Sequence, residues 1–310
     1  MTRLTRAETG DTLSALDRPA LVEPWELPTP LLPVALTAPT RADSDKLTAA
    51  LHRLSVEDAT IRLERNAETE QQVLWVMGQA QKDLILSHLR DKLSLKVVEE
   101  DVRVPLRETF LTPVKGLGRN VKQSGGHGQY AVCNVEVTPL GRGPASSSST
   151  RWWAGPCPRL HRLCREGPHP ADGARHPLRR PTVDIRVTLY DGKSHSVDSS
   201  DMAFQVSGQL ALRDAAEKGS VGVLEPVDRV KVRIADSYLG AVLTDLGSRR
   251  AQVQGSDLDG VGHATVEALV PQIELVSYPI DLRGLAQGTG SFSREFSGYE
   301  LMPEELWPAR

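Results

Sequence analysis

The chain has 310 residues, of which 39% are hydrophobic and 25% charged, an ordinary globular composition with room for two or three domains. Its formal net charge is −3, so overall charge gives no attraction to nucleic acid and any RNA contact must use local patches. Three cysteines argue against a secreted disulfide framework, and no apolar run approaches the ~20 residues that span a bilayer. These properties predict a soluble cytoplasmic protein.

From residue 31 to residue 98 the pattern alternates as strand, helix, strand, strand, helix, strand. Leucines within 47–54 recur at i, i+4 and i+7, the spacing of one helix face, and Thr40 or Asp43 is placed to cap that helix. A second apolar stripe over 85–93 marks the second helix. This order is typical of a split βαβ, ferredoxin-like domain.

Residues 99–223 contain two strand patterns and one helix. Apolar residues alternate over 130–137 and again over 183–190, as in half-buried strands. Residues 191–194, Asp-Gly-Lys-Ser, are expected to turn the second strand. Ser199 or Ser200 is then placed to cap a helix over 201–218.

A second split βαβ pattern follows residue 224, and the tail from Met302 is expected to fray. Its predicted elements are a strand at Val230–Ile234, a helix at Leu239–Arg250, strands near Gln252–Gln254 and His263–Leu269, a helix at Gln272–Leu285 and a strand at Gly290–Phe296.

A glycine-rich stretch lies between Lys122 and the strand that begins at Tyr130. Glycines at 125, 126 and 128 would weaken a helix or a strand, so the stretch is predicted to be a turn. A basic, glycine-rich turn at a sheet rim can press its amide groups against phosphate. The alternative is a hairpin turn that binds no ligand.

Several separate segments, in the same order along the chain, resemble domains of translation elongation factor G. Residues 104–109 (Val-Pro-Leu-Arg-Glu-Thr), 122–130 and 193–204 resemble its fourth domain. Shorter similarities to the end of the second domain, to the third and to the fifth lie at 5–13, 77–78, 224–227 and 281–288. After Met77-Gly78, however, residues 79–83 read Gln-Ala-Gln-Lys-Asp where the family has Glu-Leu-His-Leu-Glu. This departure favours a paralogue and puts in doubt any coupling of that segment to a GTPase domain.

The resemblance implies an α+β, multidomain fold in which two ferredoxin-like split βαβ domains flank an S5-like α+β domain of the fourth-domain type. The implied boundaries are a remnant of the β-barrel second domain with its linker at 1–27, the third domain at 28–98, the fourth at 99–223, the fifth at 224–302 and a tail at 303–310.

By the same resemblance, His195 occupies the tip histidine position of the fourth domain, which reaches the small-subunit decoding centre during translocation. A phosphate-binding Gly-x-x-x-x-Gly-Lys-Ser motif is incomplete, because Val187 stands where the first glycine is required. We therefore expect the C-terminal part of an elongation-factor-G-like GTPase that itself binds no GTP, Mg²⁺ or other cofactor and holds no catalytic or metal site. The expected partners of this monomer are the ribosome, ribosomal RNA, and the tRNA and mRNA of the decoding centre, and no membrane. The residues expected to contact them are Ser124, Gly125, Gly126, His127, Gly128, Gln129, Lys193, Ser194 and His195.

Residues 141–181 differ in composition from the rest, since arginine, proline, glycine and serine dominate and valine, isoleucine, phenylalanine and lysine are missing. Shifted by two bases, codons compatible with 143–155 encode Ser-Gly-Phe-Glu-Phe-Val-Asp-Lys-Val-Val-Gly-Gly, similar to a fourth-domain strand, and the family-like sequence resumes at Pro181. We interpret the stretch as a reading-frame slip and expect a loose, protease-sensitive fourth-domain core. The alternatives are a disordered linker or a zinc site, with an irregular ligand spacing, at Cys157, His161, Cys164 and His169.

Two other functions stay open on the sequence alone. One is a stand-alone RNA-binding or regulatory module with a basic linker, and the other is a non-functional pseudogene product. Weakened ribosome binding on substitution of Lys193 or His195 would favour a working tip.

Overall fold

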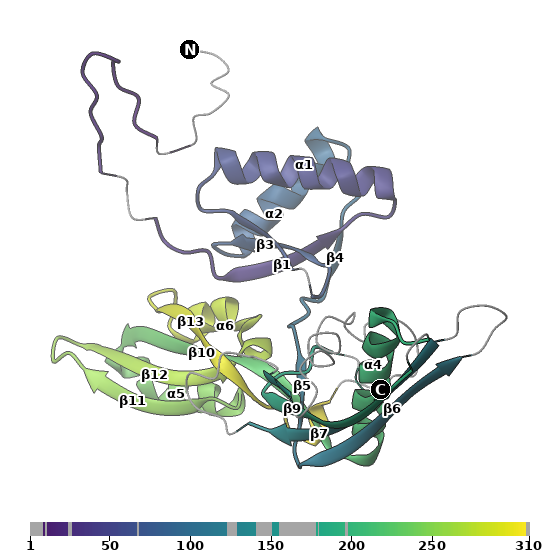
Figure 1. Cartoon of the computed structure of the whole chain (residues 1–310). Coiled ribbons are helices and arrows are strands. Elements are labelled where there is room, and N and C mark those ends of the chain that lie inside the picture. Colours follow the sequence, from purple (N-terminus) through teal and green to yellow (C-terminus); the bar gives the residue numbers. More distant parts are fainter. Residues whose placement is uncertain are drawn as a thin grey trace. The chain divides into compact units, whose positions relative to one another are not determined.

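The computed structural model describes residues 9, 11–23, 27–66, 68–122, 129–140, 151–154, 178, 180–195 and 198–307. Its elements fall into two compact units (Figure 1). Unit 1 comprises residues 1–105 and 228–296, and unit 2 comprises residues 106–227 and 297–310. Within the described ranges no helix combines the length and apolar character that crossing a membrane requires.

The first part of unit 1 is a four-stranded antiparallel sheet with the strand order β2-β3-β1-β4 and two helices. Thr40 caps the first helix, because its Oγ1 accepts a hydrogen bond from Asp43 N at 3.1 Å. Leu47 and Leu51 are fully buried in the core under that helix. The elements are β1 (Leu32–Thr37), α1 (Arg41–Glu57), β2 (Arg62–Arg65), β3 (Gln72–Val76), α2 (Gln79–Ser87), the π-helical turn η1 (His88–Lys92) and β4 (Val98–Glu100).

The second part of unit 1 is a sheet in the order β11-β12-β10-β13 with two helices, and β11 and β12 pair antiparallel. Alternate residues of β10 and β12, from Val230 to Ile234 and from Ala264 to Val270, are buried against those helices. Its elements are β10 (Val221–Ala235), η2 (Asp236–Tyr238), α5 (Leu239–Ser248), β11 (Gln252–Leu258), β12 (His263–Pro271), η3 (Gln272–Leu275), α6 (Tyr278–Leu285) and β13 (Ser291–Leu301).

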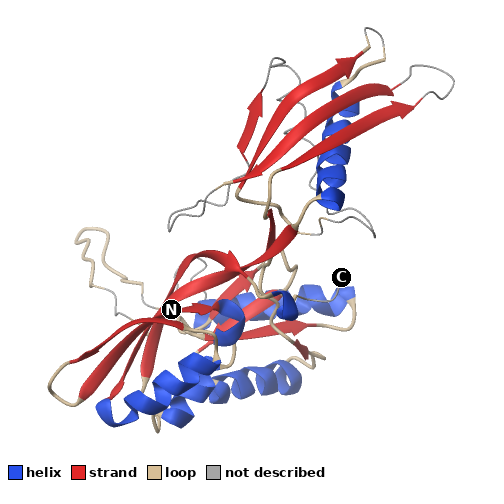
Figure 2. Ribbon diagram, turned by 90° about the horizontal axis from the view of Figure 1, so that it is seen from below, coloured by secondary structure: helices blue, strands red, loops and turns tan. Residues whose placement is uncertain are grey.

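In its described residues, unit 2 is a sheet in the order β6-β7-β9-β8 with the long helix α4 along one face (Figure 2). In this sheet β6–β7 and β7–β9 pair antiparallel, and β8–β9 pairs parallel. Ser200 caps α4, since its Oγ accepts a hydrogen bond from Ala203 N at 3.2 Å. The elements are β5 (Arg107–Phe110), β6 (Val114–Lys122), β7 (Gln129–Pro139), β8 (Arg151–Ala154), β9 (Ile185–Ser194) and α4 (Asp201–Lys218).

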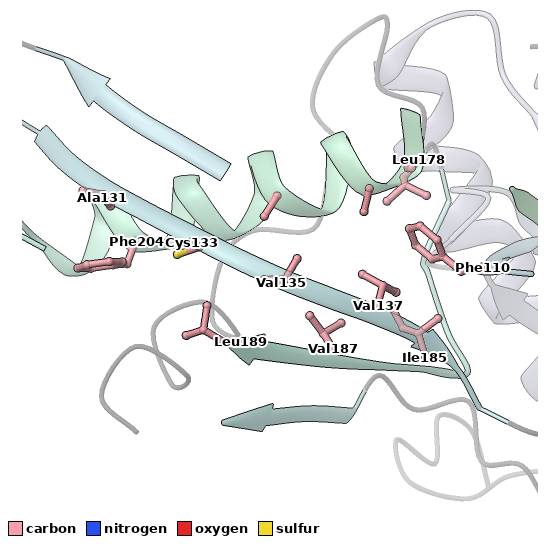
Figure 3. Packing of buried hydrophobic residues seen from close by; sticks show 14 residues of the cluster. Phe110, Ala131, Cys133, Val135, Val137, Leu178, Ile185, Val187, Leu189 and Phe204 are labelled. Carbon is pink, nitrogen blue, oxygen red and sulfur yellow. The ribbon is translucent and has the colours of Figure 1, made fainter. Parts of the chain in front are cut away.

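The core of unit 2 lies between α4 and the strands. Figure 3 shows Val135, Val137, Val187 and Leu189 along two neighbouring strands beside the helix. Each of these four side chains is at most 2% exposed. The described residues of unit 2 therefore form a packed core. The expectation that this core is loose and protease-sensitive concerns its stability and stays a prediction.

Both β10 and β13 continue from one unit into the other. Val221–Leu224 of β10 pair with β5 inside unit 2, and the strand continues without a break to Ala235. The prediction of a frayed tail from Met302 is wrong for residues 302–307, because Met302 N donates to Val223 O at 2.9 Å, while residues 308–310 lie outside the described part of the chain. The helical turn η4 (Glu304–Leu306) follows, and Trp307 Nε1 donates back to Met302 O at 2.9 Å.

Candidate RNA-contacting tip

The predicted tip of unit 2 lies where β7 begins and β9 ends. Lys193 and Ser194 are the last paired residues of β9, opposite Val132 and Ala131 of β7. The predicted turn at Asp191–Ser194 is wrong, because a register shift between Asn134 and Val135 lets β9 continue pairing past Asp191. Lys193 therefore projects from a strand rather than from a loop.

His195 follows directly, and hydrogen bonds fix the backbone around it. His195 N donates to Ser199 Oγ at 2.8 Å, and Ser199 Oγ donates to Tyr130 O at 2.7 Å. Tyr130 N donates in turn to Asp198 O at 2.8 Å. These bonds tie the start of β7 to the chain segment that leads into α4, so the histidine has a defined position.

The imidazole of His195 is half exposed and near both a carboxylate and an aromatic ring. Its Nδ1 lies 3.3 Å from Asp198 Oδ2 and 3.3 Å from Asp198 N, and its ring centroid is 6.1 Å from that of Tyr130. Neutral imidazole can accept from the amide through Nδ1, and protonated imidazole can donate to the carboxylate. The ring is thus suited to polar contacts, while the Ser199 hydroxyl already donates to a carbonyl and is no activated nucleophile.

The structure describes four of the nine residues predicted for the tip. Gln129 starts β7, Lys193 and Ser194 end β9, and His195 follows them. The strand register places Gln129 opposite Lys122 of β6, so these residues share one end of the sheet. Ser124, Gly125, Gly126, His127 and Gly128 lie outside the described residues.

Sequence reasoning missed Tyr130 and Asp198 as parts of the tip, and it offered Ser199 only as a possible helix cap. Ser200 makes the cap, and Ser199 instead connects His195 to Tyr130. A pair of serines before a helix was the available signal, but only the fold shows which of them is free to bridge.

Helix α4 packs directly against β6. This close packing sets the position of the tip segment that leads into the helix. A Cβ built on Gly118 would lie 1.7 Å from Ser207 O, and one on Gly116 would lie 2.0 Å from Ala211 O. Ser207 Oγ also donates to Gly118 O at 2.9 Å. Glycine is required at both positions because a side chain would occupy the space of the helix backbone.

Asp214 adds a polar contact between the same two elements. Its Oδ2 accepts from Leu117 N at 2.8 Å and pairs with Lys218 Nζ. Burial pushes the pKa of Asp214 upward, but the hydrogen bonds from Lys218 and Leu117 outweigh it and lower the pKa below its ordinary value.

The unusual segment 79–83 has a structural use in unit 1. Gln81 Oε1 accepts from Met77 N at 2.8 Å, and its Nε2 donates to Asp58 Oδ2 at 3.0 Å and Thr60 Oγ1 at 2.9 Å. Burial raises the pKa of Asp58, yet the hydrogen bonds from Thr60 and Gln81 bring it below the ordinary value. Gln81 thus joins the start of α2 to the turn before β2.

Among the residues that the structure describes, no group of three His, Cys, Asp or Glu side chains is placed to hold a metal ion. The alternative zinc ligands Cys157, His161, Cys164 and His169 lie outside those residues.

Comparison with protein families finds three matches along the chain. The model described as elongation factor G domain III matches residues 27–100, that of domain IV matches residues 174–220, and that of the elongation factor G C-terminus matches residues 222–309. The fold and these matches define the chain as part of a translation elongation factor. It belongs to the elongation factor G family and is mixed α+β, as the sequence predicted.

Individual relatives agree with this assignment. Elongation factor G-like proteins of two Mycobacterium tuberculosis strains, H37Rv and CDC 1551, are each 48% identical over 308 residues, which cover 97% of this chain. A crystal structure of a Thermus thermophilus protein matches 91% of the chain with a TM-score of 0.79 and 33% identity. The chain spans 42% of the length of each of these proteins.

Proposed function

We propose that this chain is the ribosome-binding region of an elongation-factor-G-like protein, with Lys193 and His195 of unit 2 contacting RNA of the small-subunit decoding centre. The observation that carries the proposal is the tip itself. It presents an amine and an imidazole on a backbone that Ser199 and Tyr130 hold in place. The domain IV model, which matches residues 174–220, covers this segment.

The chemistry of the tip suits folded RNA better than a specific base sequence. A lysine neutralises phosphate as a point charge, and an imidazole can donate to and accept from phosphate, ribose or a base edge. Folded RNA is recognised largely through such shape and backbone contacts. In the complete protein, GTP binding elsewhere would drive insertion of this tip beside tRNA and mRNA during translocation, in the cytoplasm and as a monomer.

The test is co-sedimentation of the purified chain with 70S ribosomes at increasing salt. Lys193→Ala and His195→Ala should each weaken binding, and Lys193→Ala should also reduce its salt dependence because one phosphate contact is lost. Lys231→Ala is the matched control, since that lysine lies on unit 1 and pairs with Glu267 at 2.8 Å. An affinity for 70S ribosomes that is unchanged by both tip substitutions would refute the tip as the contact.

A further inference from the structure

Unit 2 has a second surface, on the side of its sheet opposite α4. Gly116 and Gly118 face the helix, so the residues between and beside them on β6 point away from it. Lys115, Leu117 and Arg119 are exposed accordingly, and Leu117 keeps 47% of its surface accessible.

The strand register extends this surface over β7 and β9. Arg119 lies opposite Val132, and Val132 lies opposite Lys193. Tyr130 of β7 lies on the same side of the sheet, because it pairs with Val121 of β6. We call this surface the open face, and the residues that carry the argument are Lys115, Arg119, Tyr130, Arg186, Tyr190 and Lys193.

The open face is positively charged although the whole chain carries a net charge of −3. Within the described part of the chain, none of its four cations forms an ion pair. Two exposed cations of β10 in unit 1 differ, since Lys231 pairs with Glu267 at 2.8 Å and Arg233 with Asp259 at 3.8 Å. Cations without a carboxylate partner are available for an anionic ligand.

Two acidic residues share the open face and do not reverse this balance. Glu136 lies opposite Lys115 and Thr188. Asp191 is already engaged, because its Oδ2 accepts from Asn134 Nδ2 at 3.1 Å and its Oδ1 from Gly192 N at 2.9 Å.

Two tyrosines accompany the cations, Tyr190 exposed and Tyr130 partly buried. Tyr190 is 41% exposed, and Lys115 Nζ lies 5.3 Å from its ring centroid. Tyr130, on the adjacent strand, is close to His195. Sheet faces that combine aromatic rings with basic side chains bind single-stranded nucleic acid, because bases stack on the rings and phosphates meet the cations. An acidic protein would use the cations alone.

We propose that the open face binds single-stranded RNA, with Tyr190 and Tyr130 stacking on bases and Arg119 and Arg186 contacting phosphates. The proposal rests on the proposed function in that Lys193 belongs both to the tip and to this face. It adds an RNA path along the sheet, away from the tip.

The test measures fluorescence anisotropy of a fluorescein-labelled 12-nucleotide oligouridine titrated with the whole chain at several salt concentrations. The double variant Arg119→Gln/Arg186→Gln should weaken binding about tenfold and flatten the plot of log K against log salt by about 1.4, at ~0.7 for each lost phosphate contact. Tyr190→Leu should weaken binding about fivefold or more without changing that slope, because it removes stacking and no charge. The control Lys231→Gln/Arg233→Gln, whose cations are paired, should bind like the unmodified chain.

Unchanged affinity and slope in the Arg119→Gln/Arg186→Gln variant would overturn the proposal. Oligouridine binding that depends on the arginines but is unchanged in Tyr190→Leu would also overturn it, because the face would then attract phosphate by charge alone, without base stacking. Failure of the proposed function is separable. If the open-face variants weaken oligouridine binding while His195→Ala leaves 70S binding unchanged, only the tip assignment fails. If His195→Ala weakens 70S binding while the open-face variants leave oligouridine binding unchanged, only the present inference fails.

Discussion

Replacing Gly118 by alanine should loosen α4 from the sheet of unit 2. The added Cβ would lie 1.7 Å from Ser207 O, whereas a relaxed contact between carbon and a carbonyl oxygen is about 3.3 Å, so helix and strand must separate by about 1.6 Å. Overpacking of this kind costs about 1–3 kcal/mol, and loss of the buried Ser207–Gly118 hydrogen bond adds about 1 kcal/mol. We expect a loss of about 2–4 kcal/mol of stability.

Hydrogen exchange of the α4 amides, residues 201–218, measures this loss in unit 2 directly. A loss of about 2 kcal/mol lowers protection about 30-fold, and larger losses lower it further. Gly240→Ala in α5 is the matched control, because no heavy atom lies within 4 Å of its added Cβ and alanine favours a helix. If Gly118→Ala leaves α4 as protected as in the unmodified chain, the reasoning that glycine sets the helix position is wrong.

Three further perturbations test other parts of the structure. Arg294→Met should lower the urea midpoint of unit 1 by the equivalent of about 3 kcal/mol, since it strips the 2.6 Å ion pair from the buried Asp228, and adding Asp228→Asn should recover much of the loss. Asp214 has a lowered pKa when folded, so its stabilising effect is present above the ordinary aspartate pKa and is lost as pH falls through the folded value. Asp214→Asn should therefore make the melting temperature of unit 2 fall less steeply as the pH drops from about 5 to about 3. The stability involved is less than about 1 kcal/mol, because the Asp214–Lys218 pair is largely exposed. An unchanged dependence of melting temperature on pH would contradict this. Removing residues 304–310 should destabilise unit 2 by about 1 kcal/mol because the Trp307 hydrogen bond is lost, whereas removing only 308–310 should have no effect on its thermal melt.

The order of elements in unit 1 could be predicted from local signals, and so could the place where each capped helix begins. Each cap was narrowed to two candidates, and the structure shows that Thr40 and Ser200 make the cap bonds. The boundary within residues 272–285 was missed. The predicted single helix is a 3₁₀ turn followed by α6, and Pro279 lies in the first turn of α6, where proline is favoured.

The length of β10 could not be predicted from the sequence. Pro226 is typical of a strand end, and the predicted strand began only at Val230. The structure continues the strand through this proline, because residues 222–228 are buried on both faces and tertiary packing outweighs local preference. The tip shows the same limit, since the link from Tyr130 to Asp198 joins residues that only the folded sheet brings together.

The way in which β10 and β13 cross the unit boundary has a consequence for synthesis of the chain. Unit 2 takes residues 106–227 first and residues 297–310 last, so the hydrogen bond from Met302 N to Val223 O forms only after all of unit 1 has been made. At about 5–20 residues per second, roughly 4–16 s separate the emergence of these two residues. During that interval Val221–Leu224 have β5 as a partner but lack the C-terminal strand, which leaves an open strand edge on the nascent chain.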